Sequence, residues 1–211
     1  MSQLALDGVD VFGVGDELGR VYTPLALSRA IVAAIRIDGL VETVVEPSVG
    51  GGSLVLAARE RWPEAQYIGV DKDRGAKGFE DCDEVFLADW LEFAPEWAKL
   101  IGRDVHSTLI VRPDLVIGNP DFGRKDCKIP LAHTEAALSL RPRVCAFILP
   151  FSYLCNKTWA PLLEKHPPFR VHRIIGRVWR VVREVAVYEF HDGFTGETRT
   201  SVLPGFVGST R

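Results

Sequence analysis

Several features that would place this chain of 211 residues in a special class are missing from its sequence. No apolar run approaches the roughly 20 residues that a membrane-spanning helix needs. The segment from Met1 to Asp7 lacks the basic region and the apolar stretch of a signal peptide. Internal repeats, low-complexity tracts and a convincing linker are missing as well. We therefore expect a single domain in a cytoplasmic protein that does not bind a membrane.

Cysteine motifs and a net positive charge are also missing. The four cysteines, Cys82, Cys127, Cys145 and Cys155, show no Cys-x-x-Cys spacing, and no histidine pair lies at zinc-finger distance. This pattern predicts reduced, mostly buried thiols and no bound metal. The net charge of −3 does not favour nucleic acid through the overall field of the protein. Any nucleic-acid binding therefore requires a local basic patch.

Hydrophobic periodicity predicts an α/β protein. Thr23 and Pro24 are expected to begin a helix, with Thr23 as the N-cap and Pro24 at the first helical position. Strands are predicted at 41–46, 66–71, 84–88, 114–118, 143–149, 171–178 and 184–191, and further helices at 52–61 and 129–140. The last two strands should form a hairpin. Alternating strands and helices before a hairpin indicate a parallel sheet with an antiparallel edge element.

A glycine-rich turn follows the first predicted strand, from Glu46 through Ser48 and Gly50 to Gly52. Consecutive glycines permit positive φ and a close approach of ligand to backbone, and the N–H groups of the next helix favour an anionic group such as a carboxylate. Asp71 ends the second predicted strand, where a carboxylate can accept hydrogen bonds from both hydroxyls of a ribose. The turn matches neither the dinucleotide fingerprint nor the phosphate-binding loop.

A second group of interest, Asn119-Pro120-Asp121-Phe122, ends the strand predicted at 114–118. The nitrogen of a planar amine or amide is a poor nucleophile because its lone pair is delocalised. Two acceptors against its N–H groups would localise that lone pair: the side-chain oxygen of Asn119 and the backbone carbonyl of Pro120. Phe122 offers an aromatic face on which a planar substrate can stack.

The spacing Glu46-x-Ser48-x-Gly50-x-Gly52 resembles the first motif of class I S-adenosylmethionine-dependent methyltransferases. The resemblance implies S-adenosylmethionine as cofactor, with the glycine turn around its methionine part and Asp71 on its ribose. It also implies that Asp89 accepts a hydrogen bond from the adenine amino group and that Trp90 or a neighbour flanks the adenine ring. The fold it implies is Rossmann-like: a mostly parallel seven-stranded sheet with an antiparallel C-terminal strand and helices on both faces.

The segment from Asn119 to Phe122 resembles the Asn-Pro-Pro-Tyr/Phe motif of amino-methyltransferases that act on adenine N6, cytosine N4 or glutamine N5, with Asp121 in place of the second proline. Asp121 could loosen the loop, add a hydrogen bond to the substrate or weaken the enzyme. Tyr22-Thr23-Pro24 resembles the segment that precedes the cofactor motif in adenine-N6 DNA methyltransferases and lines the pocket near the methionine. The resemblance thus makes Asn119, Pro120, Asp121 and Phe122 the catalytic residues.

An arginine-rich region favours nucleic acid over a protein substrate. Residues 170–183 contain five arginines and no acid, and the residues singled out for nucleic-acid contact are Arg124, Lys125, Arg173, Arg177, Trp179 and Arg180. We expect an N-terminal arm at 1–22 and one methyltransferase domain at 23–211 without a large target-recognition domain. The leading hypothesis is adenine-N6 methylation of DNA, with a partner subunit or short-site specificity for target recognition. RNA adenine, protein glutamine N5 and a non-catalytic nucleic-acid-binding module are the alternatives.

Overall fold

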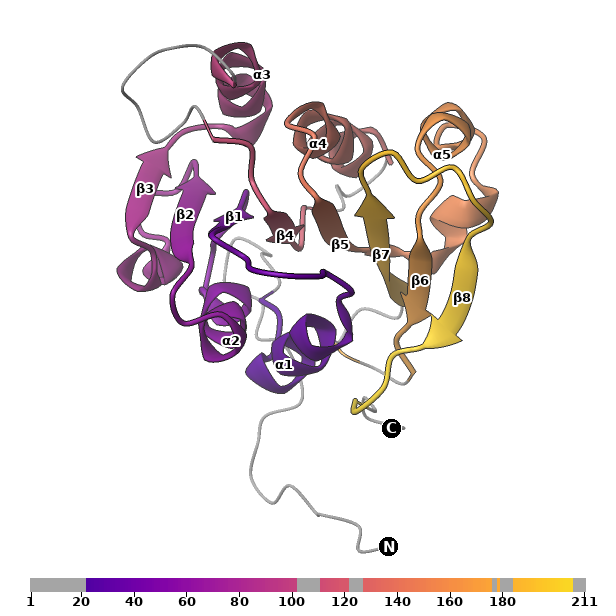
Figure 1. Ribbon diagram of the computed structural model, residues 1–211, viewed down its shortest axis with the longest axis horizontal. Coiled ribbons are helices and arrows are strands. Elements are labelled where there is room, and N and C mark those ends of the chain that lie inside the picture. The colour runs from indigo at the N-terminus through magenta and orange to yellow at the C-terminus, as the bar shows by residue number, and fades with distance from the viewer. Residues whose placement is uncertain (1–21, 102–110, 122–126, 176–177, 179–183, 207–211) are drawn as a thin grey trace, which may run out of the picture.

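The computed structural model describes residues 22–101, 111–121, 127–175, 178 and 184–206 and builds them around one sheet (Figure 1). The strand order is β3-β2-β1-β4-β5-β7-β6-β8. The strands are β1 (Thr43–Glu46), β2 (Gln66–Asp71), β3 (Glu84–Leu87), β4 (Leu115–Gly118), β5 (Val144–Pro150), β6 (Arg170–Arg173), β7 (Val185–His191) and β8 (Arg199–Val202). In this described part, β7 is antiparallel to both of its neighbours and the other pairs are parallel.

The predicted α/β sheet with a late antiparallel strand is confirmed, and so is the hairpin between β6 and β7. The predicted count of seven strands is wrong, because β8 adds an eighth strand beside β6. The strand predicted at 171–178 is also too long, since β6 ends at Arg173. The other predicted strands all exist, with ends that move by no more than a few residues.

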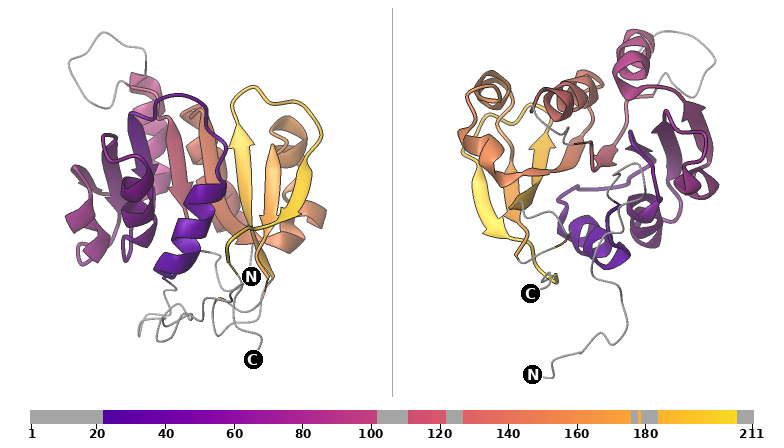
Figure 2. Two further views of the ribbon diagram at one scale, coloured as in Figure 1. Left: turned by 60° about the horizontal axis from the view of Figure 1, so that its bottom comes forward. Right: turned by 180° about the vertical axis from the view of Figure 1, so that it is seen from behind.

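Helices cover both faces of the sheet (Figures 1 and 2). One face carries α1 (Leu25–Ala34) and α2 (Ser53–Arg61), and the other carries α3 (Trp90–Leu100), α4 (Lys128–Ser139) and α5 (Ala160–Lys165). Two short 3-10 helices, η1 (Lys77–Asp81) and η3 (Phe151–Cys155), follow β2 and β5. Strands β1, β2, β4 and β5 are parallel to one another, so they end at the same edge of the sheet. The connections that follow them lie close together at this edge.

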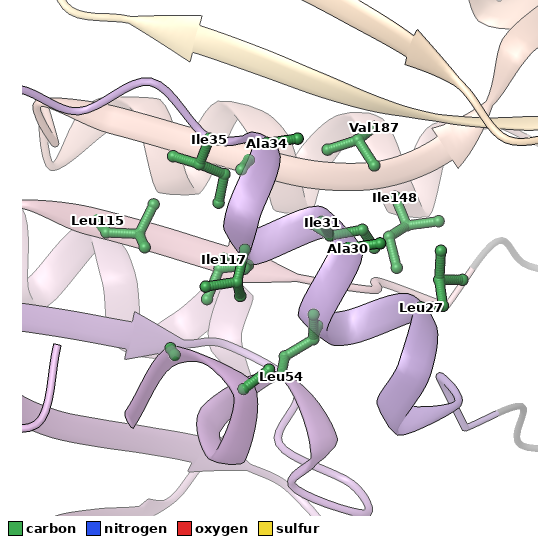
Figure 3. Packing of buried hydrophobic residues seen from close by; sticks show 14 of the residues in the cluster. Leu27, Ala30, Ile31, Ala34, Ile35, Leu54, Leu115, Ile117, Ile148 and Val187 are labelled. Carbon is green, nitrogen blue, oxygen red and sulfur yellow. The ribbon is translucent and has the colours of Figure 1, made fainter. Parts of the chain in front are cut away.

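Alternation along the strands divides the core into two layers. In the first layer, Leu27 and Ile31 of α1 and Leu54 of α2 pack against strand residues that include Ile117 and Ile148 (Figure 3). The adjacent residues of those strands face the opposite layer, which is rich in large aromatics: Trp90, Trp97, Phe147, Trp159, Tyr188 and Phe190. Burial of each such side chain contributes about 1.5–3 kcal/mol, so both layers hold the strand ends in place.

The cysteine prediction is wrong in one respect. Cys145 is buried, but Cys82 and Cys127 are only partly buried and Cys155 is exposed, so the thiols are not mostly buried; all four are free. In the part of the chain that the structure describes, no group of three or more candidate ligands could hold a metal ion. Nor do the described helices include one with the length and apolar character to cross a membrane. Residues 1–21 of the predicted N-terminal arm lie outside the described residues.

Candidate active site

The glycine turn and Asp71 lie side by side at the carboxyl edge of the sheet. Strands β1 and β2 are parallel neighbours in which Glu46 is paired with Gly69, so the residues that follow the two strands lie at the same edge of the sheet. The backbone N–H of Gly50 donates to Oδ2 of Asp71 at 3.0 Å, and the N–H of Asp73 donates to Oδ1 at 2.8 Å. Each carboxylate oxygen can accept more than one hydrogen bond, so Asp71 keeps acceptor capacity for a ligand.

The glycines of the turn are needed for contacts inside the chain. Gly50 and Gly52 have φ of +48° and +76°, which glycine adopts at little cost. A Cβ on Gly52 would lie 2.6 Å from the Cα of Gly78 in η1, and a Cβ on Gly50 would lie 3.1 Å from the ring of Tyr22. Thus η1 and Tyr22 both approach the turn closely. The hydroxyl of Ser48 donates to the carbonyl of Pro47 at 2.8 Å.

Glu46 is a buried carboxyl group at the base of this turn. Its side chain is only 3% exposed, and its Oε2 atom has no hydrogen-bond partner within the described residues. Burial raises its pKa well above the usual value, a hydrogen bond from the backbone of Val55 lowers it in part, and the charge of Asp71 raises it further. An unpartnered buried oxygen of this kind is costly unless a ligand supplies a donor.

Asn119 is held by the segment that precedes α1. Its Nδ2 group donates to the hydroxyl of Thr23 at 3.2 Å, while its Oδ1 atom is buried without a partner among the described residues. The carbonyl of Thr23 accepts a hydrogen bond from the hydroxyl of Ser53 at 2.7 Å, which ties this segment to α2. The prediction that Thr23 is an N-cap is therefore wrong: Pro24 occupies that position, and the Thr23 hydroxyl serves Asn119 instead.

The rest of the Asn-Pro-Asp-Phe motif is only partly described. Pro120 is buried and Asp121 is exposed, whereas Phe122 lies outside the described residues. Burial of the ring lowers the pKa of His133 in α4, and the charge of nearby Asp121 opposes this shift in part. Lys72 lowers the same pKa and Asp89 raises it. No spacing in the sequence linked His133 to this site, because the charges that act on it come from the connections after three different strands.

Asp89 and Trp90 fill structural positions at the start of α3. Oδ1 of Asp89 accepts a hydrogen bond from the backbone N–H of Leu91 at 2.9 Å, so Asp89 caps this helix. Trp90 is only 2% exposed, and its indole N–H donates to the carbonyl of His133 at 3.2 Å. Trp90 therefore has no exposed ring face against which an adenine could lie. We correct the prediction for Trp90 and retain Asp89 as a candidate.

Of the residues predicted to contact nucleic acid, the structure describes only Arg173. Its guanidinium lies 4.9 Å from the ring centre of Phe151, which follows β5. Arg124, Lys125, Arg177, Trp179 and Arg180 lie outside the described residues. The contact brings the end of β6 to the end of β5, at the same edge as Asn119.

The strand order with β7 antiparallel, the glycine turn after β1 and the acid after β2 give the chain the class I S-adenosylmethionine-dependent methyltransferase fold. A Listeria monocytogenes protein assigned to that class superposes with a TM-score of 0.67 at 10% identity, over 90% of this chain and 68% of that one. The methyltransferase subunit of a type I restriction-modification system from Streptococcus thermophilus gives a TM-score of 0.63 at 18% identity, over 83% of this chain and 45% of that one.

A curated relative is similar over part of the sequence. The type II methyltransferase M.XamI of Xanthomonas campestris pv. amaranthicola is 31% identical in a match of 84 residues, and the match covers 35% of this chain and 16% of the relative. The match thus spans about a sixth of that relative's length. No family model matches the sequence.

Proposed function

We propose that this protein transfers a methyl group from S-adenosylmethionine to the N6 amine of adenine in DNA. The observation that carries the proposal is the state of Asn119. Because Thr23 accepts the hydrogen bond from Nδ2, the Oδ1 atom is turned away from Thr23 and is left buried and unpartnered among the described residues. The Oδ1 atom can therefore accept a hydrogen bond from an amino N–H of a substrate.

The role of the motif is to make a delocalised amine nucleophilic. Oδ1 of Asn119 and the carbonyl of Pro120 accept one N–H each, which draws the amine nitrogen towards tetrahedral geometry and concentrates its lone pair. When bound, S-adenosylmethionine supplies a methyl group on a sulfonium that leaves as a thioether with the electron pair of the broken C–S bond. The new N–C bond uses the nitrogen lone pair, and the nitrogen then releases a proton to solvent water. Alignment in a site of low water content is the main task of the protein.

The residues of the glycine turn fit the cofactor. Glu46 offers a buried acceptor for the ammonium of the methionine part, since its Oε2 atom has no partner in the described structure. Asp71 lies against the turn at the end of β2, where it can accept hydrogen bonds from ribose hydroxyls. Asp89 is proposed for the adenine amino group, and Tyr22 for the methionine side of the pocket.

DNA is favoured as substrate by two observations. The relative with local sequence similarity is a type II methyltransferase, and one structural neighbour is a subunit of a restriction-modification system. Arg173 lies at the carboxyl edge of the sheet beside an aromatic ring, a combination used for contacts with phosphate and bases. Target recognition by a partner subunit is part of this proposal.

The experiment is a methyl-transfer assay with labelled cofactor. The protein is incubated with radiolabelled S-adenosylmethionine and, separately, with single-stranded DNA, duplex DNA, RNA and cell protein. The products are digested and identified by mass spectrometry. We expect N6-methyladenine in DNA. Label in RNA adenine would show that the substrate is RNA and would refute DNA. Label in glutamine would refute the nucleic-acid assignment, and no label in any of the four samples would refute the methyltransferase activity.

A further inference from the structure

A cavity of 410 Å³ opens at the carboxyl end of β5, outside the motifs described above. It is lined by Pro150, Phe151, Ser152, Tyr153 and Glu184. Its walls are held in place: the hydroxyl of Tyr188 lies 3.1 Å from the carbonyl oxygens of both Pro150 and Phe151. The backbone N–H of Phe151 donates to the carbonyl of Glu184 at 2.9 Å. The cavity is therefore part of the fixed frame of the sheet.

The register of the sheet places this cavity beside Asn119. Gly118 of β4 is paired with Phe147 of β5, so Asn119 is level with Ile148 and two residues short of Pro150. One strand spacing of about 4.8 Å and two residues of about 3.3 Å put the Cα atoms of Asn119 and Pro150 about 8 Å apart. That distance is too great for one base to occupy both positions, and it suits two neighbouring nucleotides of an unstacked strand.

The lining of the cavity suits a nucleobase. Phe151 is half-buried and presents its ring to the guanidinium of Arg173 at 4.9 Å. Tyr153 is 6% exposed and stacks on Trp159 with ring centres 4.5 Å apart, which gives the cavity a rigid aromatic wall. Arginine and aromatic rings together bind bases by stacking and cation–π contact. Within the described residues, Arg173 forms no salt bridge that would hold it away from a ligand.

The acid in the lining excludes a free phosphate as the preferred occupant. The carboxylate of Glu184 repels a phosphate, whereas it accepts an N–H from the edge of a base. Ser152 adds a hydroxyl that can donate or accept. The lining therefore offers a stacking face and hydrogen-bonding groups, with the guanidinium of Arg173 against Phe151, around a space large enough to hold a nucleobase.

We propose that this cavity binds the base next to the reacting adenine, stacked on Phe151 and covered by Arg173. The inference rests on the proposed function, which it deepens by giving the enzyme a second nucleotide subsite. A base held there would position the reacting nucleotide at Asn119 and would favour a strand that is single or locally opened.

The chain offers a closely matched control for the experiment. Arg170 lies at the other end of β6, and its guanidinium covers Phe169 at 5.3 Å in the same type of contact. Arg173→Met and Arg170→Met therefore remove the same charge from the same strand, but only the first lies at the cavity. Phe151→Leu removes the aromatic face and keeps an apolar side chain, and Phe151→Trp restores an aromatic face.

The measurement uses single-stranded oligodeoxynucleotides with 2-aminopurine beside one adenine, in the presence of S-adenosylhomocysteine for binding and of S-adenosylmethionine for turnover. The fluorescence of 2-aminopurine falls when the base stacks. Loss of one base stack costs about 5- to 150-fold in affinity. We expect Phe151→Leu and Arg173→Met to lose the quenching and raise KM for the oligonucleotide within that range, with kcat and cofactor affinity unchanged. Phe151→Trp and Arg170→Met should behave as the original protein does.

The outcomes separate this inference from the proposed function. If the protein methylates DNA adenine and Phe151→Leu leaves both KM and quenching unchanged, the subsite is refuted and the proposed function stands. Equal effects of Arg170→Met and Arg173→Met would also refute it, because they would show a general charge effect. If the original protein neither binds nor methylates any nucleic acid, both proposals fail. Unchanged cofactor affinity in each variant shows that the fold is intact.

Discussion

Asn119 has one side-chain partner within the described part of the chain, and that partner fixes its orientation. The hydrogen bond from Nδ2 to Thr23 leaves Oδ1 as an acceptor at the end of β4. We expect Asn119→Ala to lower kcat about 10²- to 10³-fold, by analogy with loss of one hydrogen-bonding group from a transition-state site. The affinity for S-adenosylhomocysteine should stay within twofold. Single-turnover transfer and isothermal titration calorimetry measure the two quantities.

Asn156 provides the control for that substitution. Its Oδ1 atom accepts hydrogen bonds from the backbone N–H of Thr158 and from the thiol of Cys127, and neither partner belongs to the Asn-Pro-Asp-Phe motif. Asn156→Ala should therefore retain full kcat. Turnover by Asn119→Ala at the original rate would remove Asn119 from the catalytic role, whereas a joint loss of cofactor affinity would assign it to the fold of the pocket instead.

Glu46 should make stability depend on pH in an unusual direction. Its carboxyl faces the backbone of Val55, the charge of Asp71 and the thiol of Cys82. Because its pKa is raised in the folded state, the native protein holds a proton that the unfolded chain releases above about pH 4.5. The contribution of this group to stability therefore falls as pH rises from 4.5 through the raised pKa. Glu46→Gln, which is uncharged and of the same size, should remove this part of the pH dependence.

Urea unfolding between pH 4.5 and pH 9 without cofactor measures the effect. The control is Glu60→Gln, since Glu60 is an exposed partner of Arg29 at 2.6 Å and should keep the original slope. Parallel slopes for Glu46→Gln and the original protein would show that Glu46 is ionised in the absence of cofactor. In that case Glu46 would not have to lose a proton before it binds the ammonium group of the cofactor.

At the scale of elements, the sequence predicted most elements that have a clear burial pattern, and it missed β8, which has none, and α3, which contains a proline. Strand β2 was predicted with its exact bounds because an apolar run is bounded there by polar residues. All four residues of strand β8 are exposed, so no hydrophobic pattern in the sequence indicates this strand. It forms by pairing with β6. Helix α3 contains Pro95, which argues against a helix, although the buried positions Trp90, Ala94 and Trp97 have helical spacing.

The parts of the site that lie at or directly after the ends of strands could be predicted from the sequence. The rule that parallel strands end at one edge placed the glycine turn, Asp71 and Asn119 together. Contacts between distant segments were not predictable: the hydroxyl of Thr23 reaches Asn119 across 96 residues of sequence. The burial of Trp90 was hidden for the same reason, because it depends on how α3 packs against α4.

The strands β6 and β7 share a buried charge on the face that carries α1. Glu189 is fully buried, accepts a hydrogen bond from the backbone of Arg36 at 2.7 Å and lies 2.7 Å from Nε2 of His191. Oε2 of Glu189 is 3.8 Å from His172. Although burial opposes ionisation, the nearby imidazole of His172 and the hydrogen bonds from His191 and Arg36 bring the pKa of Glu189 down to about 2. The cluster thus joins the end of α1 to the hairpin.

We expect Glu189→Gln to lower the free energy of unfolding by about 3 kcal/mol at pH 7, the value of a pKa lowered from 4.5 to about 2. This contribution is present in full above pH 4.5 and is lost as pH falls from 4.5 towards 2. Urea unfolding at pH 7, 4.5 and 3 should therefore show a difference between variant and original protein that shrinks at pH 3. A constant difference at all three values would indicate lost packing rather than a lost charge interaction.

Considered as a whole, the molecule has two edges with different chemistry. At the amino end of the parallel strands, arginines are paired with acids: Arg143 with Asp114 at 2.8 Å, and Arg112 with Asp192 at 2.9 Å. At the carboxyl edge, Glu46 and Asn119 each keep an unpartnered oxygen within the described residues. At the first edge these charged groups have ion-pair partners inside the chain, although Nε of Arg112 has no hydrogen-bond partner within the described residues, whereas the two oxygens at the second edge can accept hydrogen bonds from a ligand. Ligand binding should therefore stabilise the whole fold.

This stabilisation can be measured as a shift in the melting temperature. A ligand at about 100 times its Kd adds about 2.7 kcal/mol to the stability of the native state. For a domain of this size, each kcal/mol raises Tm by about 2–4 °C, so S-adenosylhomocysteine should raise Tm by about 5–10 °C. Asp71→Asn should lose most of the shift at the same ligand concentration, because the neutral amide is a weaker acceptor for ribose hydroxyls. Asp73→Asn, two residues further along the same connection, is the matched control and should keep most of the shift. Equal shifts in all three proteins would place the ligand away from Asp71, and no shift in the original protein would refute the cofactor assignment.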